Sequence, residues 1–255
     1  MLVTTDSIIL RSRKQGDTSK IVSIYTLDFG MVDVIAKGAR EMKSKFGSAL
    51  EPFTSSKVSF YKKEGRDLYL LSNAEIITPL RNLQSDLEHI EAATRMVELL
   101  LQAQHHEESH PNLFRLVQTA LQTLNSTSES KAVSSVLFSY YLKYLSFAGF
   151  AVKMDRMNRD STKSSYFDIF NGSVIELQND ESENDRLVLL SPETVAALAH
   201  LERTEIQNSS QLRMSEQAIF QLNNLFRAYF AHHIEGMQRN RNKSGKVFSA
   251  MGKSK

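Results

Sequence analysis

Apolar and polar residues alternate with a period of two along the first eighty residues of this chain. Around residue 59, for example, Val58 and Phe60 fall on one side while Lys57, Ser59 and Tyr61 fall on the other, as expected for a strand with one buried face. Turn residues separate runs of this kind. The pattern predicts five short strands, at residues 7–12, 21–28, 31–39, 55–63 and 68–76.

Five short strands in a segment of this length favour a closed sheet, because closure removes exposed strand edges. A tight turn at Glu64 and Gly65 and a longer loop between the third and fourth strands are typical of a five-stranded oligonucleotide-binding (OB) barrel. Such barrels bind single strands by contacting phosphates with Lys and Arg and by stacking bases on exposed aromatic rings. The pattern therefore predicts a nucleic acid as the ligand.

The predicted barrel carries cations and aromatic residues that suit this role. The candidate phosphate contacts are Arg11, Arg13, Lys14, Lys37, Arg40, Lys43, Lys45, Lys62, Lys63 and Arg66. The candidate stacking rings are Tyr25, Phe46, Tyr61 and Tyr69, each of which also suits a core or rim position. In the loop at 36–45, Gly38 is expected to turn the backbone, and Arg40 is expected to hold a phosphate with two N–H groups of its planar fork. Phe46 is expected to anchor this loop in the core.

Beyond Thr78 the apolar period changes to about 3.6, which predicts a helical bundle. Ser191 and Pro192 have the residue types of a helix cap and a first helical position, and a last helix is expected to end near His233. The predicted fold class is α+β, an OB barrel followed by an α-helical bundle. Its parts are an OB domain at 1–80, a helical domain at 81–235 with an insertion around 155–185, and a tail at 236–255.

Charge is distributed unevenly along the chain. The net charge of +2 hides a basic first segment at 1–80, an acidic middle at 81–235 and a tail at 236–255 with six Lys and Arg and no acidic residue. This asymmetry favours a polyanion-binding surface over uniform solubilisation, although a solvated surface with a basic tail accounts for the charges as well. The tail adds four candidate DNA contacts, Arg239, Arg241, Lys243 and Lys246.

The composition excludes several classes of protein. Cys is absent, so disulfides and thiolate metal sites are excluded. The first residues lack the features of a signal peptide, and no apolar run approaches the length needed to span a bilayer. A cytoplasmic location is expected.

The motif HEESH at 106–110 matches the zinc-binding pattern H-E-x-x-H, which needs one uninterrupted helix through both His residues. Pro111 follows directly and disfavours helical backbone at His110, and the stretch lies between two apolar stripes, where a polar connection is expected. No phosphate-binding loop and no nucleophile elbow is present in the sequence. We therefore expect no catalytic residue, no metal and no cofactor.

Several residue groups together resemble the bacterial recombination-mediator family RecO. They are AKGAR at 36–40, KSK at 43–45, LEPF at 50–53 and AE at 74–75, and the likeness continues through FAGF at 147–150 to NKSGKVFSAM near the end. The resemblance implies a nucleoid-associated mediator of DNA repair and recombination that binds single- and double-stranded DNA and anneals complementary strands without ATP. It also implies RecR and the C-terminal tail of single-strand-binding protein as partners, and RecA as the recombinase that is loaded.

The residues alone leave two other functions open. An RNA-binding factor can use the same barrel, because a basic loop does not reveal a preference for the 2′-hydroxyl. A non-catalytic scaffold whose bundle docks protein partners is the second.

Many relatives of this family carry a four-Cys zinc site in the segment 155–185. This chain has Met157 and Asp160 where the first Cys pair would fall, so zinc is not expected. YFDIF and SVIEL instead predict a metal-free hairpin around Asn171 and Gly172, and residues 178–185 predict an acidic exposed loop.

Overall fold

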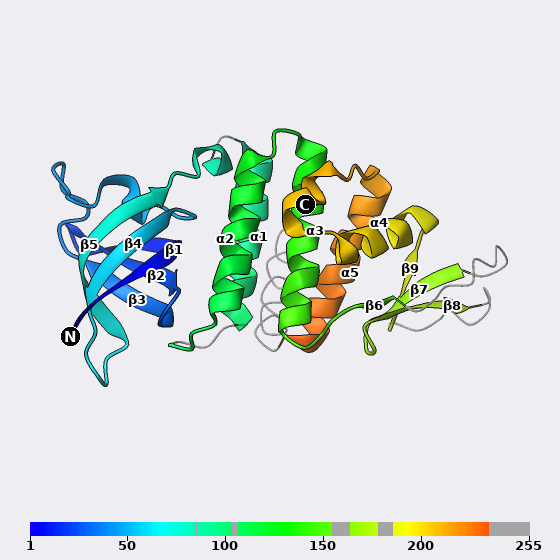
Figure 1. The fold of residues 1–255 in the computed structure, drawn as a ribbon, viewed down its shortest axis with the longest axis horizontal. Helices are drawn as coiled ribbons and strands as arrows, with labels where there is room; N and C mark the ends of the chain where they lie inside the picture. Colours follow the sequence, from blue (N-terminus) through cyan, green and yellow to red (C-terminus); the bar gives the residue numbers. More distant parts are fainter. Residues whose placement is uncertain (85, 104–106, 155–163, 178–185, 235–255) are drawn as a thin grey trace, which may run out of the picture. The chain divides into compact units, whose positions relative to one another are not determined.

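The computed structural model describes residues 1–84, 86–103, 107–154, 164–177 and 186–234 (Figure 1). The chain forms two compact units, Met1–Ser128 and Glu129–Lys255, and each is described by itself. The boundary expected at residue 80 marks the change from strands to helices, whereas the first compact unit also includes the first two helices.

A closed five-stranded barrel opens the first unit, with neighbours in the order β1-β2-β3-β5-β4 (Figure 1). The strands are β1 (Leu2–Gln15), β2 (Ser19–Thr26), β3 (Gly30–Ala36), β4 (Ser55–Tyr61) and β5 (Leu68–Thr78). β3 and β5 pair in parallel, and the other neighbours pair antiparallel. The predicted OB barrel followed by helices is therefore confirmed.

Strand β1 is longer than the sequence pattern predicted. A bulge between Ile9 and Arg11 bends it, so its first half pairs with β4 and its second half with β2. The residues that the prediction missed include Thr4, Thr5 and Asp6, whose polarity hides the strand. Side chains that alternate along the five strands fill the interior of the barrel. Those from β2 and β3 are Val22, Ile24, Val32, Val34 and Ala36.

Helices α1 (Leu87–Ala103) and α2 (Pro111–Ser126) follow a short 3₁₀ turn, η2 (Arg81–Gln84). The connection between the two helices lies on the β2–β3 turn, where the Glu107 amide donates to the Met31 carbonyl at 2.9 Å. Gly30 has a φ of +65°, and an added Cβ would lie 2.1 Å from the Glu108 carbonyl oxygen. This close approach requires glycine.

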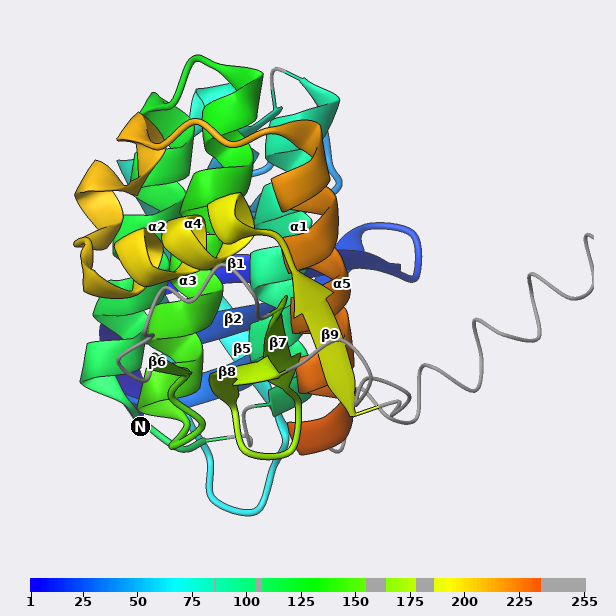
Figure 2. The same ribbon diagram turned by 90° about the vertical axis from the view of Figure 1, so that its right-hand side faces the viewer.

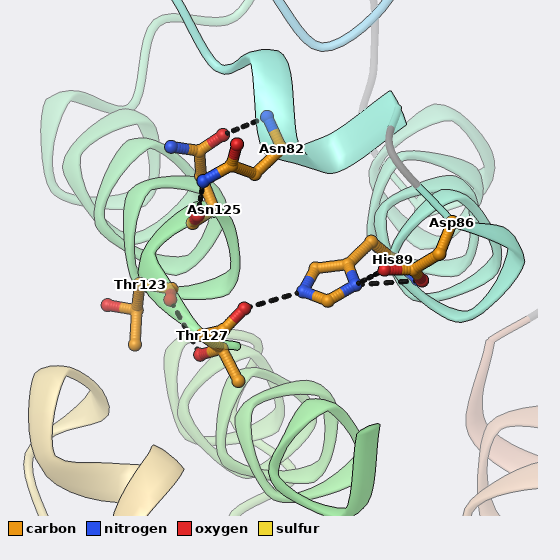
Figure 3. A network of polar contacts seen from close by, with 6 residues as sticks. All are labelled: Asn82, Asp86, His89, Thr123, Asn125 and Thr127. Atoms are coloured by element: carbon orange, nitrogen blue, oxygen red, sulfur yellow. Dashed lines mark hydrogen bonds and ion pairs between the residues drawn. The ribbon is translucent and has the colours of Figure 1, made fainter. Parts of the chain in front are cut away.

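Polar contacts join η2 and the beginning of α1 to the end of α2 (Figure 3). Asn82 and Asn125 exchange two hydrogen bonds of 3.0 Å. The ring of the buried His89 lies 2.9 Å from the Asp86 carboxylate at Nδ1 and 2.9 Å from the Thr127 carbonyl at Nε2. Both ring nitrogens of His89 have partners within the fold, so this residue stabilises the helix pair.

The second unit combines three helices with a small sheet. The helices are α3 (Ser130–Phe147), α4 (Pro192–Arg203) and α5 (Glu216–His233), joined by a 3₁₀ turn, η4 (Ile206–Gln211). Figure 2 shows α4 crossing α3. The sheet order is β6-β8-β7-β9, formed by β6 (Lys153–Met154), β7 (Ser164–Asp168), β8 (Ser173–Leu177) and β9 (Leu187–Leu190). As predicted, Ser191 caps α4, with its hydroxyl accepting from the Thr194 amide at 3.2 Å.

The predicted hairpin is confirmed, because β7 and β8 pair antiparallel around Asn171 and Gly172. The buried Asp168 carboxylate accepts from the Phe170 amide at 2.9 Å and pairs with Arg186 through two hydrogen bonds. The bonded Arg186 guanidinium holds the pKa of Asp168 at about 2, below its usual 3.8, although burial acts in the opposite direction. An ion pair therefore fastens the turn. The predicted acidic loop at 178–185, and Met157 and Asp160, lie outside the described residues.

Candidate nucleic-acid interface

The second half of β1 and the loop after β3 bring cations to the same end of the barrel. Beyond the bulge, Arg11, Arg13 and Lys14 are exposed on β1. The following β1–β2 turn touches the β3–β4 loop directly, since the Arg40 amide donates to the Thr18 carbonyl at 2.9 Å. Lys37 and Lys43 extend the exposed basic surface along that loop.

Arg40 fastens this loop. Its Nη1 donates to the backbone carbonyls of Gly16 and Asp17, both at 2.9 Å, so part of the planar fork expected to hold a phosphate is bonded within the protein. Gly38 has a φ of +70°, which confirms its predicted role in turning the backbone. The loop is therefore preformed, and the hydrogen bonds of Arg40 hold it against the β1–β2 turn.

Lys45 and Phe46 anchor the far end of the same loop. Phe46 is buried in the barrel core, as predicted. The Lys45 ammonium donates to the Ser72 carbonyl of β5 at 2.6 Å and lies 5.2 Å from the centre of the Phe46 ring. Lys45 is exposed and keeps its charge, but its ammonium is held at Ser72 and is less free to move toward a phosphate than that of Lys37 or Lys43.

The loop between β4 and β5 carries Lys62, Lys63 and Arg66. The Lys62 ammonium lies 2.7 Å from a carboxylate oxygen of Glu107 and above the rings of Phe29 and Tyr69. Glu107 also accepts a hydrogen bond from the Tyr69 hydroxyl. Burial, followed by the Glu107 carboxylate, raises the pKa of Tyr69 to about 12. The charge of Lys62 is thus compensated from within the chain, while Lys63 and Arg66 are exposed.

The candidate cations fall into two groups. Arg40, Lys45 and Lys62 bond to other parts of the protein. The others have no side-chain hydrogen bond or ion pair within the described ranges, and they are Arg11, Arg13, Lys14, Lys37, Lys43, Lys63 and Arg66. The second group is available to neutralise phosphates.

Three of the four candidate stacking rings are buried. Tyr25 lies 6.1 Å from Phe114 of α2, ring centre to ring centre, and Phe46 and Tyr69 belong to the barrel core. Only Tyr61 among the four is exposed, at 48%. The expectation of a base-stacking ring is therefore restricted to Tyr61.

The motif HEESH does not form a helix over residues 107–110, because α2 begins at Pro111, and His106 lies outside the described residues. Within the described ranges, no group of three or more His, Cys, Asp or Glu side chains suits a metal ion. No helix in those ranges is long and apolar enough to cross a membrane. The four tail candidates, Arg239, Arg241, Lys243 and Lys246, lie outside the described residues.

Sequence reasoning missed the part played by Glu107. It lies 45 residues from Lys62 in the chain, inside a motif that points to zinc. No local pattern connects the two, because their contact depends on where the α1–α2 connection lies on the barrel.

Most of the length of the chain is similar to known proteins. Residues 1–80 match the family "Recombination protein O N terminal", and residues 84–243 match "Recombination protein O C terminal". A DNA repair protein RecO of Salinibacter ruber is 29% identical over 246 residues, which cover 95% of this chain and 92% of that protein. A DNA repair protein RecO of a Nocardioides species is 32% identical over 242 residues, 92% of this chain and 96% of that protein. The resemblance found in the sequence is thereby confirmed, and the chain belongs to the RecO family.

Proposed function

We propose that this chain is a non-catalytic mediator of DNA repair and recombination that binds single- and double-stranded DNA and anneals complementary strands without ATP. The general role in repair and recombination follows from membership of the family. The observation that carries DNA binding is a cluster of cations at one end of an OB barrel that have no side-chain partner among the described residues, namely Arg11, Arg13, Lys14, Lys37 and Lys43.

The physical basis proposed for annealing is charge neutralisation. Each strand brings one negative charge per phosphate, and two strands on one basic surface repel each other less than in solution. The loop that presents Lys37 and Lys43 is already fastened by Arg40 and Lys45, so binding loses little entropy in ordering it. Nucleation of pairing between the strands is then easier, and no nucleotide hydrolysis is needed.

Annealing of two complementary labelled oligonucleotides without ATP tests the proposal. We expect the protein to accelerate duplex formation, and to bind with a log–log salt slope of about −5 to −6 if all seven unpaired cations contact phosphates. An RNA competitor of the same sequence distinguishes a DNA mediator from an RNA-binding factor. Unchanged annealing rates together with a slope near zero would contradict the proposal.

The proposed partners are RecR and the C-terminal tail of single-strand-binding protein, with RecA loaded as the consequence. The family assignment supports them, and the proposed location is the cytoplasm, at the nucleoid. A binding titration with purified RecR, and another with a peptide of the single-strand-binding protein tail, test the partners separately. Failure of both would leave a DNA-binding protein without a mediator role.

A further inference from the structure

An apolar row crosses the outer surface of the barrel. Leu2 of β1 pairs in register with Tyr61 of β4, and Tyr61 pairs with Leu70 of β5. All three point away from the core, with exposed fractions of 52%, 48% and 38%. Leu68, also 38% exposed, lies two residues before Leu70 on the same face of β5.

The neighbouring rows on this outer surface are polar. Thr4 pairs with Ser59, and their hydroxyls lie 2.8 Å apart. Asp6 pairs with Lys57 in the row after that. The solvent-exposed face of a sheet normally carries polar residues along its length. A contiguous apolar row with an aromatic ring on that face therefore indicates a binding surface.

Cations lie before Leu68 and beyond Leu70 along β5. Lys63 and Arg66 lie in the loop that leads into Leu68, a loop that also holds Glu64 and Asp67. On the other side, the Lys45 ammonium lies at the carbonyl of Ser72, two residues beyond Leu70. A ligand with flat apolar groups flanked by negative charges fits this arrangement, and single-stranded nucleic acid is such a ligand.

The surface that OB barrels usually offer to oligonucleotides, on their second and third strands, is partly covered in this chain. Tyr25 of β2 packs against Phe114, and Met31 of β3 is buried beneath the connection between α1 and α2. Bases cannot reach either residue. The row on β1, β4 and β5 is, by contrast, exposed within the described part of the first unit.

We propose that bases of single-stranded nucleic acid stack on Tyr61 and lie against Leu2, Leu68 and Leu70. This inference rests on the proposed function and deepens it, because it separates base contact from phosphate contact. A duplex keeps its bases stacked inside, so it binds through the cations alone. The row therefore gives the protein a preference for single strands.

The absence of tryptophan from the chain allows a direct test. Tyr61→Trp introduces one fluorescent ring into the row, and Phe220→Trp, at an exposed position of α5, is the matched control. We expect a thymine oligonucleotide to quench the fluorescence of the Tyr61→Trp variant, whereas an abasic strand of equal length and a duplex do not. No ligand should quench the control.

Affinity provides the second readout. Tyr61→Ala should weaken binding to single strands by about five- to tenfold, at the lower end of stacking contributions, and leave duplex binding within about twofold. Phe220→Ala controls for loss of an exposed ring. If the wild type binds single strands but Tyr61→Ala binds them equally well, or the abasic strand quenches as strongly, the inference is wrong and the proposed function stands.

Two further results would overturn the inference. In the first, the fluorescence of the Tyr61→Trp variant changes with protein concentration and does not change when oligonucleotide is added. The row would then be a contact between copies of the chain. A wild type that binds no DNA at low salt would overturn the inference and the proposed function together.

Discussion

Several cations of the barrel surface differ from Arg186 of the second unit in that they have no partner. Lys14 near the end of β1, and Lys37 and Lys43 in the β3–β4 loop, are exposed and have no partner within the described residues. In the second unit, Arg186 is bonded to the buried Asp168. A paired cation must give up its partner before it can contact a phosphate, so pairing as well as exposure decides which cations bind a polyanion. Lys62 of the barrel, paired with Glu107, resembles Arg186 in this respect.

The largest expected effect comes from removing unpaired cations. Replacing three of them by Ala together, Lys14, Lys37 and Lys43, should weaken DNA binding roughly hundredfold at 0.15 M salt. It should also make the log–log salt slope shallower by about three units. The melting temperature should hardly change, because exposed substitutions typically alter stability by under about 0.5 kcal/mol each. Filter binding across a salt series measures the slope. Equal binding by the variant would move the interface to the basic tail.

The second effect concerns stability alone. Asp168→Asn removes the charge that pairs with Arg186, and should lower the free energy of unfolding by about 2–3 kcal/mol while leaving DNA affinity unchanged. Arg213→Ala is the matched control, because its pair with Glu129 is exposed and screened by solvent, so its loss should destabilise the fold less than Asp168→Asn does. Urea denaturation measures both. If Asp168→Asn weakened DNA binding without destabilising the fold, the Asp168–Arg186 pair would serve DNA binding and not stability.

Lowering the pH should remove the stabilisation that the Asp168 carboxylate provides. The folded pKa of Asp168, about 2, is lower than its usual 3.8, so its stabilisation is complete above the unfolded pKa and is lost as the pH falls through this interval. The difference corresponds to about 2 kcal/mol. The gap in unfolding free energy between wild type and Asp168→Asn should therefore shrink as the pH falls from about 5 to about 2. A gap that stays constant would show that Asp168 is not the titrating group.

A smaller effect distinguishes cations within the barrel loops. Arg40→Ala removes the bonds to the carbonyls of Gly16 and Asp17 and should cost about 1 kcal/mol of stability. Amide exchange at Glu41 and Ser44 should accelerate, since the loop loses these hydrogen bonds. Lys37→Ala should weaken DNA binding but leave this exchange unchanged. If Arg40→Ala changes DNA binding and amide exchange in the same way as Lys37→Ala, Arg40 does not hold the loop and acts only as a phosphate-binding cation.

The smallest expected change is a gain. Glu107→Gln removes the carboxylate beside Lys62 and frees one ammonium for a phosphate, which should strengthen DNA binding by about fivefold at 0.15 M salt. Glu108→Gln is the control, since its carboxylate does not pair with Lys62. An unchanged affinity for the Glu107 variant would mean that Lys62 lies outside the DNA path.

The sequence predicted the barrel because strand periodicity and turn residues are local signals, and closure follows from the need to hide strand edges. It located the basic loops for the same reason. It could not assign Arg40 to the β1–β2 turn, Lys62 to Glu107, or Tyr25 to Phe114, because these contacts depend on tertiary packing between distant segments. The polar Thr4, Thr5 and Asp6 likewise give no apolar repeat, so the first residues of β1 were missed.

During synthesis the five strands leave the ribosome before α2, so Tyr25 and Met31 have no cover until Glu107 and Phe114 follow. At about 5–20 residues per second, the interval from residue 78 to residue 114 lasts roughly two to seven seconds. A nascent barrel with an uncovered aromatic side chain is exposed to chaperones and to premature association in that time. Slow translation of residues 79–114 should therefore lower the yield of folded protein more than slow translation beyond Ser128.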